Sequence, residues 1–310
     1  MYLYKKYFNM LLNSCQDNIT QSQIIRLAKK ELERVAPDVK ITIESLKNLP
    51  ENQGVGYFFK VDSPQINSYR YWIEWTEDLG AWIERDGMQA TITIRESRLN
   101  DTKPIESSLI TCLSSHVAAT CLCLQGQIAI HANVVALNKS NSAIAFAGDS
   151  GRGKSTLTAY CASKGANFIT DDILILDELG FARPGSSRIK LFPSLAADLG
   201  LNTTSESDYK IHYSPQELGA VMAIKPLPVK VFYILEESLD LSIYTETLTL
   251  GEAITHLIRH SYHTSAIMKD NPLLFEQYID LAQRITVKRL FYPRQLELLP
   301  AVYKYLIQDR

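Results

Sequence analysis

The sequence predicts an α/β fold with a strand-rich region at its N-terminus. Three observations predict this fold. The run Gly148–Ser155, which reads Gly-Asp-Ser-Gly-Arg-Gly-Lys-Ser, fits the phosphate-loop pattern G-x-x-x-x-G-K-S/T. From residue 127 onward, strand-like and helix-like segments alternate along the chain. Before residue 125, short aromatic and β-branched runs separated by turn residues are typical of successive strands.

Composition excludes several classes of protein. The chain has 310 residues, which is room for one large or two modest domains. Its net charge of -2 leaves no basic excess to neutralise nucleic-acid phosphates, so we expect no nucleic-acid partner. The chain contains no apolar run of about 18 residues, which a membrane span would require. Its N-terminus lacks the apolar core of a secretion signal. The five cysteines form no C-x-x-C pair, which favours free thiols in a reducing cytoplasm over a zinc site.

The first 125 residues are predicted to form an accessory region of one helix and antiparallel strands. Apolar residues three and four positions apart predict a surface helix over 20–35, which ends near Pro37. Strands are expected over 56–61, 70–75, 81–85 and 89–95, and a buried helix over 107–124. The tryptophans Trp72, Trp75 and Trp82 fall among these strands, where half-buried sheet positions explain them better than a ligand site. These strands form either a domain of their own or an extension of the following sheet.

Residues 126–310 are predicted to form the phosphate-loop domain. Strands are expected over 127–137, 142–147, 167–170, 173–176, 188–192 and 229–235. Helices are expected over 155–163, 248–261, 272–284 and 294–308, and Gly165 ends the first of them. A strand, a glycine-rich loop and a helix thus follow one another, which turns the positive end of the helix dipole toward the phosphates. This context argues against a chance glycine-rich turn.

The phosphate loop predicts ATP and Mg²⁺ as cofactors. Its glycines let successive backbone N–H groups point at phosphate oxygens, while Lys154 reaches the β- and γ-phosphates. The hydroxyl of Ser155 can ligate Mg²⁺. The expected nucleotide-binding residues are Gly148, Asp149, Ser150, Gly151, Arg152, Gly153, Lys154, Ser155 and Thr156. Within this loop, Arg152 either touches phosphate or faces solvent.

Asp171 and Asp172 are the candidate acidic groups. They follow the predicted strand over 167–170, and Asp172 comes eighteen residues after Lys154. A strand beside the phosphate-loop strand ends where the terminal phosphate lies, so its acids reach Mg²⁺ or a hydroxyl nucleophile. One carboxylate can then hold the metal while the other takes the substrate proton. The alternative is a turn or helix-cap pair, because Asp is common at both.

His131 is the third candidate. It lies in the run Ile-Ala-Ile-His-Ala-Asn, on the predicted strand that pairs with or precedes the phosphate-loop strand. A lone His on an apolar strand is usually a satisfied core residue. Beside a phosphate loop and an acid pair, however, it becomes a candidate to orient the catalytic acid or the phosphoryl group.

Other polar residues allow two interpretations. Arg183, Arg188 and Lys190 either line an acceptor pocket, where an anionic group needs cationic partners, or lie on a solvated strand edge. Four residues cluster near the end of the helix predicted over 248–261, namely His256, Arg259, His260 and His263. Their position favours compensation of the helix dipole over a metal site. Arg259 is also a candidate for stabilising transition-state charge.

Three segments together resemble the core of the HPr kinase/phosphorylase family. They are His131-Ala-Asn, the loop Gly148–Ser155, and the run Gly165-Ala-Asn-Phe-Ile-Thr-Asp-Asp172. Residues 182–193 and 287–294 resemble, more weakly, the branch of this family that is found in peptide-modification gene clusters. The resemblance implies a phosphoenolpyruvate-carboxykinase-type fold and transfer of the γ-phosphoryl group to a serine hydroxyl. It also implies that Asp172 is the general base, that His131 is its neighbour, that Lys154 clamps phosphate, and that Ser155 holds Mg²⁺. Since one carboxylate of the pair can hold the metal, we expect Asp171 to be the second Mg²⁺ ligand.

The chain also departs from that family. The glycine-rich signature and the metal-binding Glu that follow the family's acid pair have no counterpart in the run Arg-Pro-Gly-Ser-Ser-Arg-Ile-Lys-Leu-Phe-Pro. The first 125 residues do not resemble the regulatory domain of the sugar-transport enzymes. They look more like the accessory region of the peptide-cluster kinases, some of which phosphorylate the terminal serine of a lasso-type precursor.

We therefore expect a cytoplasmic, ATP- and Mg²⁺-dependent serine kinase that acts on a hydroxyl-bearing peptide, protein or small molecule. A lasso-type precursor peptide is the leading acceptor, and free serine is the alternative. The rival from another class is a P-loop ATPase or nucleotide-binding sensor without an acceptor. A GTPase is disfavoured because Asn138-Lys-Ser-Asn141 precedes the loop and lacks the guanine-reading Asp. We expect no membrane partner, and the sequence is compatible with a homo-oligomer.

Overall fold

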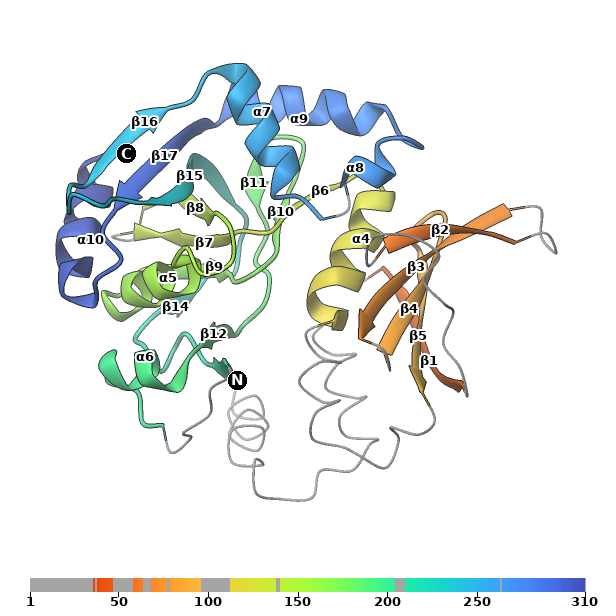
Figure 1. The fold of residues 1–310 in the computed structure, drawn as a ribbon, viewed down its shortest axis with the longest axis horizontal. Helices are drawn as coiled ribbons and strands as arrows, with labels where there is room; N and C mark the ends of the chain where they lie inside the picture. The colour runs from red at the N-terminus through yellow and green to blue at the C-terminus, as the bar shows by residue number, and fades with distance from the viewer. Residues whose placement is uncertain are drawn as a thin grey trace. The chain divides into compact units, whose positions relative to one another are not determined.

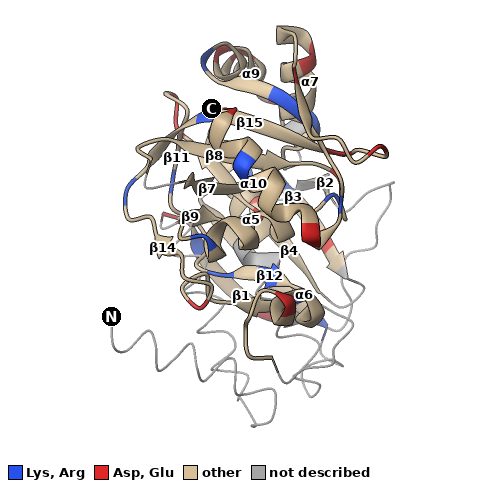
Figure 2. Ribbon diagram, turned by 90° about the vertical axis from the view of Figure 1, so that its left-hand side faces the viewer, with Lys and Arg blue, Asp and Glu red and all other residues tan. Residues whose placement is uncertain are grey.

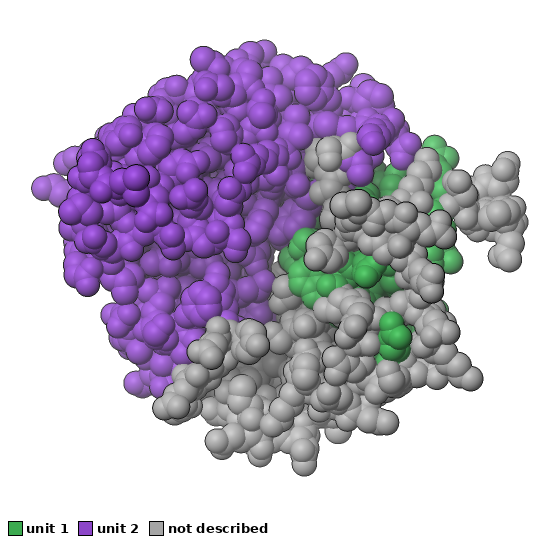
Figure 3. All heavy atoms as spheres, viewed as in Figure 1, with its two compact units in different colours: residues 1–125 green, residues 126–310 purple. Residues whose placement is uncertain are grey.

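The computed structural model describes residues 36, 38–46, 58–63, 68–76, 79–95, 112–137, 140–203, 210–262 and 264–309. The chain divides into two compact units, residues 1–125 and 126–310, which Figure 3 colours separately. The helix predicted over 20–35 lies outside the described residues.

A sheet of five strands forms the described part of unit 1, in the order β1-β5-β4-β3-β2. The strands are β1 (Lys40–Leu46), β2 (Phe58–Ser63), β3 (Ser68–Thr76), β4 (Leu79–Glu84) and β5 (Gln89–Arg95). Strands β2 to β5 form an antiparallel meander, as predicted. The sequence analysis missed β1, which pairs parallel with β5, so the sheet is not wholly antiparallel.

Aromatic residues and one helix complete the described part of unit 1. Trp72 and Trp82 contact each other across β3 and β4, with ring centroids 4.9 Å apart, as expected for sheet aromatics. A π-helical turn, η3 (Cys112–Val117), leads into helix α4 (Ala118–Leu124). Most of α4 is buried, which confirms the predicted buried helix over its described part.

Unit 2 contains the strand–loop–helix segment (Figure 1). Its strands are β6 (Ile128–Ile130), β7 (Asn133–Ala136), β8 (Ala143–Ala147), β9 (Asn167–Thr170), β10 (Leu174–Leu176), β11 (Phe181–Ala182), β12 (Ile189–Leu191), β13 (Ile211–Tyr213), β14 (Val221–Met222), β15 (Leu227–Glu237), β16 (Tyr244–Thr247) and β17 (Thr286–Tyr292). Its helices are α5 (Lys154–Ser163), α6 (Pro193–Asp198), α7 (Leu250–Arg259), α8 (Thr264–Ile267), α9 (Leu273–Arg284) and α10 (Leu299–Gln308), with a 3-10 turn η5 (Leu296–Leu298).

A mixed sheet organises unit 2. Its main path is β14-β9-β7-β8-β15-β11-β10-β6, and β17 pairs with both β15 and β16. Strand β7 is antiparallel to β8 and to β9, so β8 and β9 run in one direction with β7 between them. Strands β15 and β17 run parallel to β8. The carboxyl ends of β8, β9, β15 and β17 therefore lie at one edge, where open α/β sheets bind ligands.

One face of this sheet is covered by α5 and α10. Leu157 of α5 and Leu306 of α10 pack with Phe146, Tyr233 and Leu290 of the strands in one buried cluster. Burial of such side chains stabilises by about 1.5–3 kcal/mol each. This core fixes α5 against β8 and so fixes the loop between them.

The structure corrects two details of the predicted sheet. The strand predicted over 127–137 is two strands, because β6 pairs with β10 whereas β7 pairs with β8 and β9. His131 lies at the bend between them and not on a strand. Strand β9, expected beside β8, is separated from it by β7. The carboxyl ends of β8 and β9 nevertheless lie at the same edge.

Cys121, Cys123 and Cys161 are buried free thiols, as expected. None of the described helices is both long and apolar enough to cross a bilayer.

Candidate active site

The phosphate loop is held by its neighbouring strands. Tyr292, the last residue of β17, donates its hydroxyl hydrogen to the backbone carbonyl of Arg152 over 2.7 Å. The guanidinium of Arg152 lies 3.6 Å from Glu236 and 3.8 Å from Glu237, at the end of β15. Arg152 therefore faces acidic side chains, which neither of its two predicted interpretations included. The sequence analysis also missed the role of Tyr292.

Gly153 has to be glycine. Its φ of 92° lies in the left-handed region, which side chains disfavour. A Cβ atom at this position would also come within 2.2 Å of the Tyr292 hydroxyl. The chain thus enters α5 through a turn that leaves backbone N–H groups at the N-terminus of the helix. Such a terminus with free donors is a binding site for phosphate.

Lys154 points back over the loop. Its ammonium group donates to the carbonyl of Gly148 over 2.7 Å and to that of Asp149 over 3.4 Å. The side chain is only 8% exposed, and this burial lowers the pKa of Lys154. A buried ammonium held by two loop carbonyls lies where it can transfer its donors to phosphate oxygens. Ser155 and Thr156 follow it in the first turn of α5.

Asp172 is the more exposed of the two carboxylates. Its φ of 66° is a left-handed conformation, which among the described non-glycine residues occurs only here and at Leu241. One carboxylate oxygen accepts from the Lys190 ammonium, and the other lies 3.6 Å from Nε2 of His131. Burial disfavours the charged form of Asp172, but Lys190 and His131 prevail and hold its pKa well below the usual range. Asp172 is therefore ionised at neutral pH.

Asn133 forms hydrogen bonds with both residues of the acid pair. Its amide donates to Oδ1 of Asp171, and its own Oδ1 accepts from the backbone N–H of Asp172 over 3.2 Å. Oδ2 of Asp171 accepts from the backbone N–H of Lys190 over 3.0 Å. Asn133 and Asp171 are both buried. Burial, followed by the charge of Asp172, raises the pKa of Asp171 to about 7.

The two acids therefore differ in environment. Both oxygens of Asp171 accept hydrogen bonds from the protein, whereas the side chain of Asp172 is 22% exposed. The structure brings His131 and Lys190 to the carboxylate of Asp172. It gives Asp171 protein partners in place of an open coordination position.

The end of α7 also reaches the site. The guanidinium of Arg259 lies 3.2 Å from both carboxylate oxygens of Asp149. The backbone carbonyl of His260 accepts from the backbone N–H of His131 over 2.7 Å. Burial lowers the pKa of His260 to about 4, so it is neutral and does not compensate the helix dipole as predicted. His263 lies outside the described residues.

The oxygen atoms at this edge suit a hard cation. Mg²⁺ takes oxygen ligands and is usually held by one or two protein oxygens plus substrate phosphates. The Ser155 hydroxyl, at the start of α5, is a donor of this kind, and nucleotide phosphates would supply further oxygens. Among the described residues, no group of three or more His, Cys, Asp or Glu side chains is arranged to hold a metal by itself.

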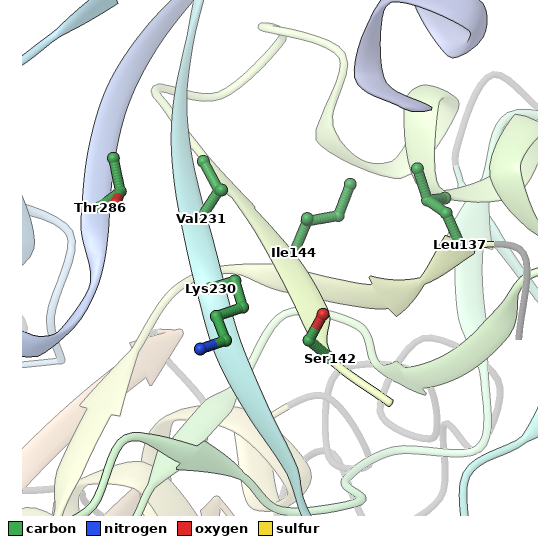
Figure 4. A pocket seen from close by; sticks show the side chains of 6 residues that line it. All are labelled: Leu137, Ser142, Ile144, Lys230, Val231 and Thr286. Atoms are coloured by element: carbon green, nitrogen blue, oxygen red, sulfur yellow. The ribbon is translucent and has the colours of Figure 1, made fainter. Parts of the chain in front are cut away.

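A separate cavity of about 370 Å³ lies at the opposite edge of the sheet (Figure 4). Ser142, just before β8, and Thr286, the first residue of β17, line it together with Leu137, Ile144, Lys230 and Val231. These are the amino ends of the strands whose carboxyl ends carry the phosphate loop. The cavity therefore takes no part in the site around Asp172.

Comparisons with known proteins found likenesses among solved structures. No protein-family model matches the sequence, and no curated protein resembles it in sequence. The solved structure of the Hpr(Ser) kinase/phosphatase from Coxiella burnetii is 15% identical, with coverage of 58% of this chain and 97% of that chain. The TM-score of this pair is 0.33, so we base the function on the residues of the site.

Proposed function

We propose that this protein is an ATP- and Mg²⁺-dependent kinase that transfers the γ-phosphoryl group to a serine-type hydroxyl. The observation that carries the proposal is the position of Asp172, at the same sheet edge as the phosphate loop and paired with His131 and Lys190. A nucleotide-binding loop alone serves many functions. An accessible carboxylate fixed beside it is what an acceptor hydroxyl requires.

The phosphate loop would bind the nucleotide. Backbone N–H groups at the start of α5 and the ammonium of Lys154 would hold the β- and γ-phosphates. Ser155 would hold Mg²⁺ together with the phosphates, and the metal would supply positive charge to the transferring group. Arg259 forms an ion pair with Asp149 of the phosphate loop. It is a further cation that could stabilise charge on the transferring phosphoryl group.

Asp172 would act as the general base. The acceptor oxygen attacks the γ-phosphorus, the bond from that phosphorus to the bridging oxygen breaks, and ADP leaves with the bond's electron pair. The hydroxyl proton passes to Asp172, which is free to take it once Lys190 moves away. His131, 3.6 Å from this carboxylate, orients it. We assign Asp171 to positioning in place of the metal-binding role expected from the sequence, because its carboxylate is buried and protein donors occupy both its oxygens.

We further propose a peptide as the acceptor, with a lasso-type precursor as the leading candidate on the strength of the sequence resemblance. Free serine is the alternative acceptor, because it presents the same hydroxyl. We also propose that the enzyme acts in the cytoplasm, where ATP is available.

Release of ADP tests the proposal against an ATPase. With the full chain, Mg·ATP and a serine-containing peptide or serine itself, we expect ADP release that depends on the acceptor. Asp172→Asn should retain nucleotide binding and lose about 10²–10⁴-fold in transfer, the usual contribution of a general base. Asp280→Asn, at an exposed position of α9, is the matched control. Acceptor-independent release, or normal transfer by Asp172→Asn, would rule out this mechanism.

A further inference from the structure

The two-stranded ribbon β12–β13 has one apolar and one basic face. The two strands are antiparallel, and Lys190 lies directly opposite His212 in the register. Cross-strand partners place their side chains on the same face, and residues two positions apart share that face. Arg188 and Lys210 therefore lie in phase with Lys190 and His212.

The opposite face of the ribbon belongs to the core. Ile189, Leu191 and Tyr213 are buried in a cluster with α5 and α6 residues. Because side chains alternate along a strand, the basic residues project from the opposite face of the ribbon, away from this cluster. Figure 2 colours the Lys and Arg positions of the described chain blue.

The basic face is turned toward the acid pair. The Lys190 ammonium contacts the Asp172 carboxylate. The charge of Lys210 acts on both Lys154 and Asp171, although burial dominates the pKa of each. Lys210 itself is exposed, and its ammonium lies 5.6 Å from the centre of the Phe192 ring. The ribbon thus carries cationic groups to the side of the site where the acceptor hydroxyl must lie.

His212 offers a polar group that its described surroundings do not use. Its Nδ1 atom is buried and has no hydrogen-bond partner among the described residues. Burial, with the nearby charges of Arg188 and Lys190, holds the pKa of His212 well below its usual range. A neutral imidazole in this position can donate to a ligand oxygen. An unpaired buried polar atom lowers stability, and a hydrogen bond to a ligand would offset this loss.

We propose that the basic face of β12–β13, formed by Lys190, Lys210 and His212, binds an anionic group of the acceptor next to the hydroxyl that is phosphorylated. This inference rests on the proposed kinase function. A carboxylate and a phosphate meet the same requirement, since both present oxygens to ammonium and imidazole donors. The nucleotide has its own donors in Lys154 and the start of α5. The acceptor is therefore a hydroxyl compound with its negative charge nearby.

Calorimetric titration of the full chain tests this site. The protein is first saturated with Mg²⁺ and a non-hydrolysable ATP analogue, and then titrated with N-acetylserine, N-acetylserinamide, glycerol 3-phosphate and glycerol. We expect one anionic compound to bind at least about tenfold tighter than its neutral counterpart, because a charge-assisted contact is lost in the latter. The pair that shows the preference identifies carboxylate or phosphate.

Variants assign the preference to the ribbon. Lys210→Gln and His212→Asn should each reduce it several-fold, whereas Lys230→Gln, an exposed lysine at the far edge of the sheet, should leave it unchanged. Equal binding of charged and neutral compounds, or no binding of any of the four, would overturn the inference. So would variants of Lys210 and His212 that weaken binding of the ATP analogue but leave the acceptor preference unchanged. Charge-dependent binding in this titration, together with no acceptor-dependent ADP release when Mg·ATP replaces the analogue, would instead refute the kinase function and leave the anion site standing.

Discussion

At the scale of single residues, the site depends on the hydrogen bonds that Asn133 makes with Asp171 and Asp172. Asn133 joins the side chain of Asp171 to the backbone of Asp172. Asp172 keeps a left-handed backbone, which costs about 1–2 kcal/mol for a residue with a side chain. Asn133 offsets this cost by accepting the N–H of Asp172. It is therefore a positioning residue that aims the carboxylate toward the loop.

Exchange of Asn133 and Asp171 tests this role. Asn133→Asp alone places two buried carboxylates face to face, and Asp171→Asn alone leaves one donor without an acceptor. Each should lower the free energy of unfolding by about 1–3 kcal/mol and reduce kcat more than it changes KM. The double variant keeps all three hydrogen bonds with the amide and carboxylate reversed, so it should recover most of both losses. Urea unfolding and steady-state kinetics measure the two; strictly additive losses would contradict the positioning role.

Lys190 sets the pH at which Asp172 loses its charge. Asp172 acts as a base only when ionised, and Lys190 helps to hold its pKa well below the usual range. In Lys190→Gln, burial dominates and the pKa rises. The acid limb of kcat/KM, measured from about pH 4 to 8, should therefore move to higher pH by about one unit or more.

The control for this shift is Lys288→Gln. Lys288 pairs with Asp309 at 2.9 Å, so the variant also breaks a lysine–carboxylate pair, but one outside the candidate site. Its acid limb should match that of the wild type. An unmoved limb in Lys190→Gln would show that Asp172 is not the base.

At the scale of elements, β17 closes the phosphate loop that β8 and α5 form. The sequence analysis recognised the loop from its glycines, but the contact that shapes it comes from Tyr292, 140 residues after Arg152. Loop and strand act together because the Tyr292 hydroxyl occupies the space that a side chain at position 153 would need.

Two glycine variants separate strain from collision. Gly151 and Gly153 both have positive φ, but a Cβ at Gly151 would meet no atom within 4 Å. Gly151→Ala should cost only backbone strain, about 1–2 kcal/mol. Gly153→Ala should cost more and weaken ATP binding further. Tyr292→Phe should reduce that additional loss, as measured by calorimetric titration with ATP; an equal loss in both backgrounds would mean that the hydroxyl does not shape the loop.

At the scale of the whole molecule, the phosphate loop belongs to the unit of residues 126–310. A ligand that binds only the folded state stabilises by about 2.7 kcal/mol at a concentration 100 times its Kd. This stabilisation should appear in the unit that carries the loop.

Hydrogen exchange checks where the stabilisation falls. With Mg²⁺ and an ATP analogue, exchange should slow over 143–163, while residues 68–95 of the other unit keep their rates. Lys154→Ala should abolish the effect, whereas Lys164→Ala, at the opposite end of α5, should retain it. Equal slowing in both units would place the response outside the phosphate loop.

Much of the loop's setting could be predicted because it is local. The strand over 142–147, the helix over 155–163 and the strand over 167–170 were each predicted within one or two residues of β8, α5 and β9. Helices α7 and α9 followed from their apolar spacing. Strands β16 and β17 were missed, although the alternation in Thr-Val-Lys-Arg-Leu-Phe-Tyr is a strand signal.

The sequence by itself determined the phosphate loop and the acid pair, since glycine freedom, the lysine and adjacent carboxylates act within a few residues of one another. Only the tertiary structure decided what surrounds them. Asn133, Lys190 and Tyr292 reach partners 18 to 140 residues away through strand pairing. Their roles depend on which strand ends share an edge, and this is fixed by the packing of the whole sheet against α5 and α10.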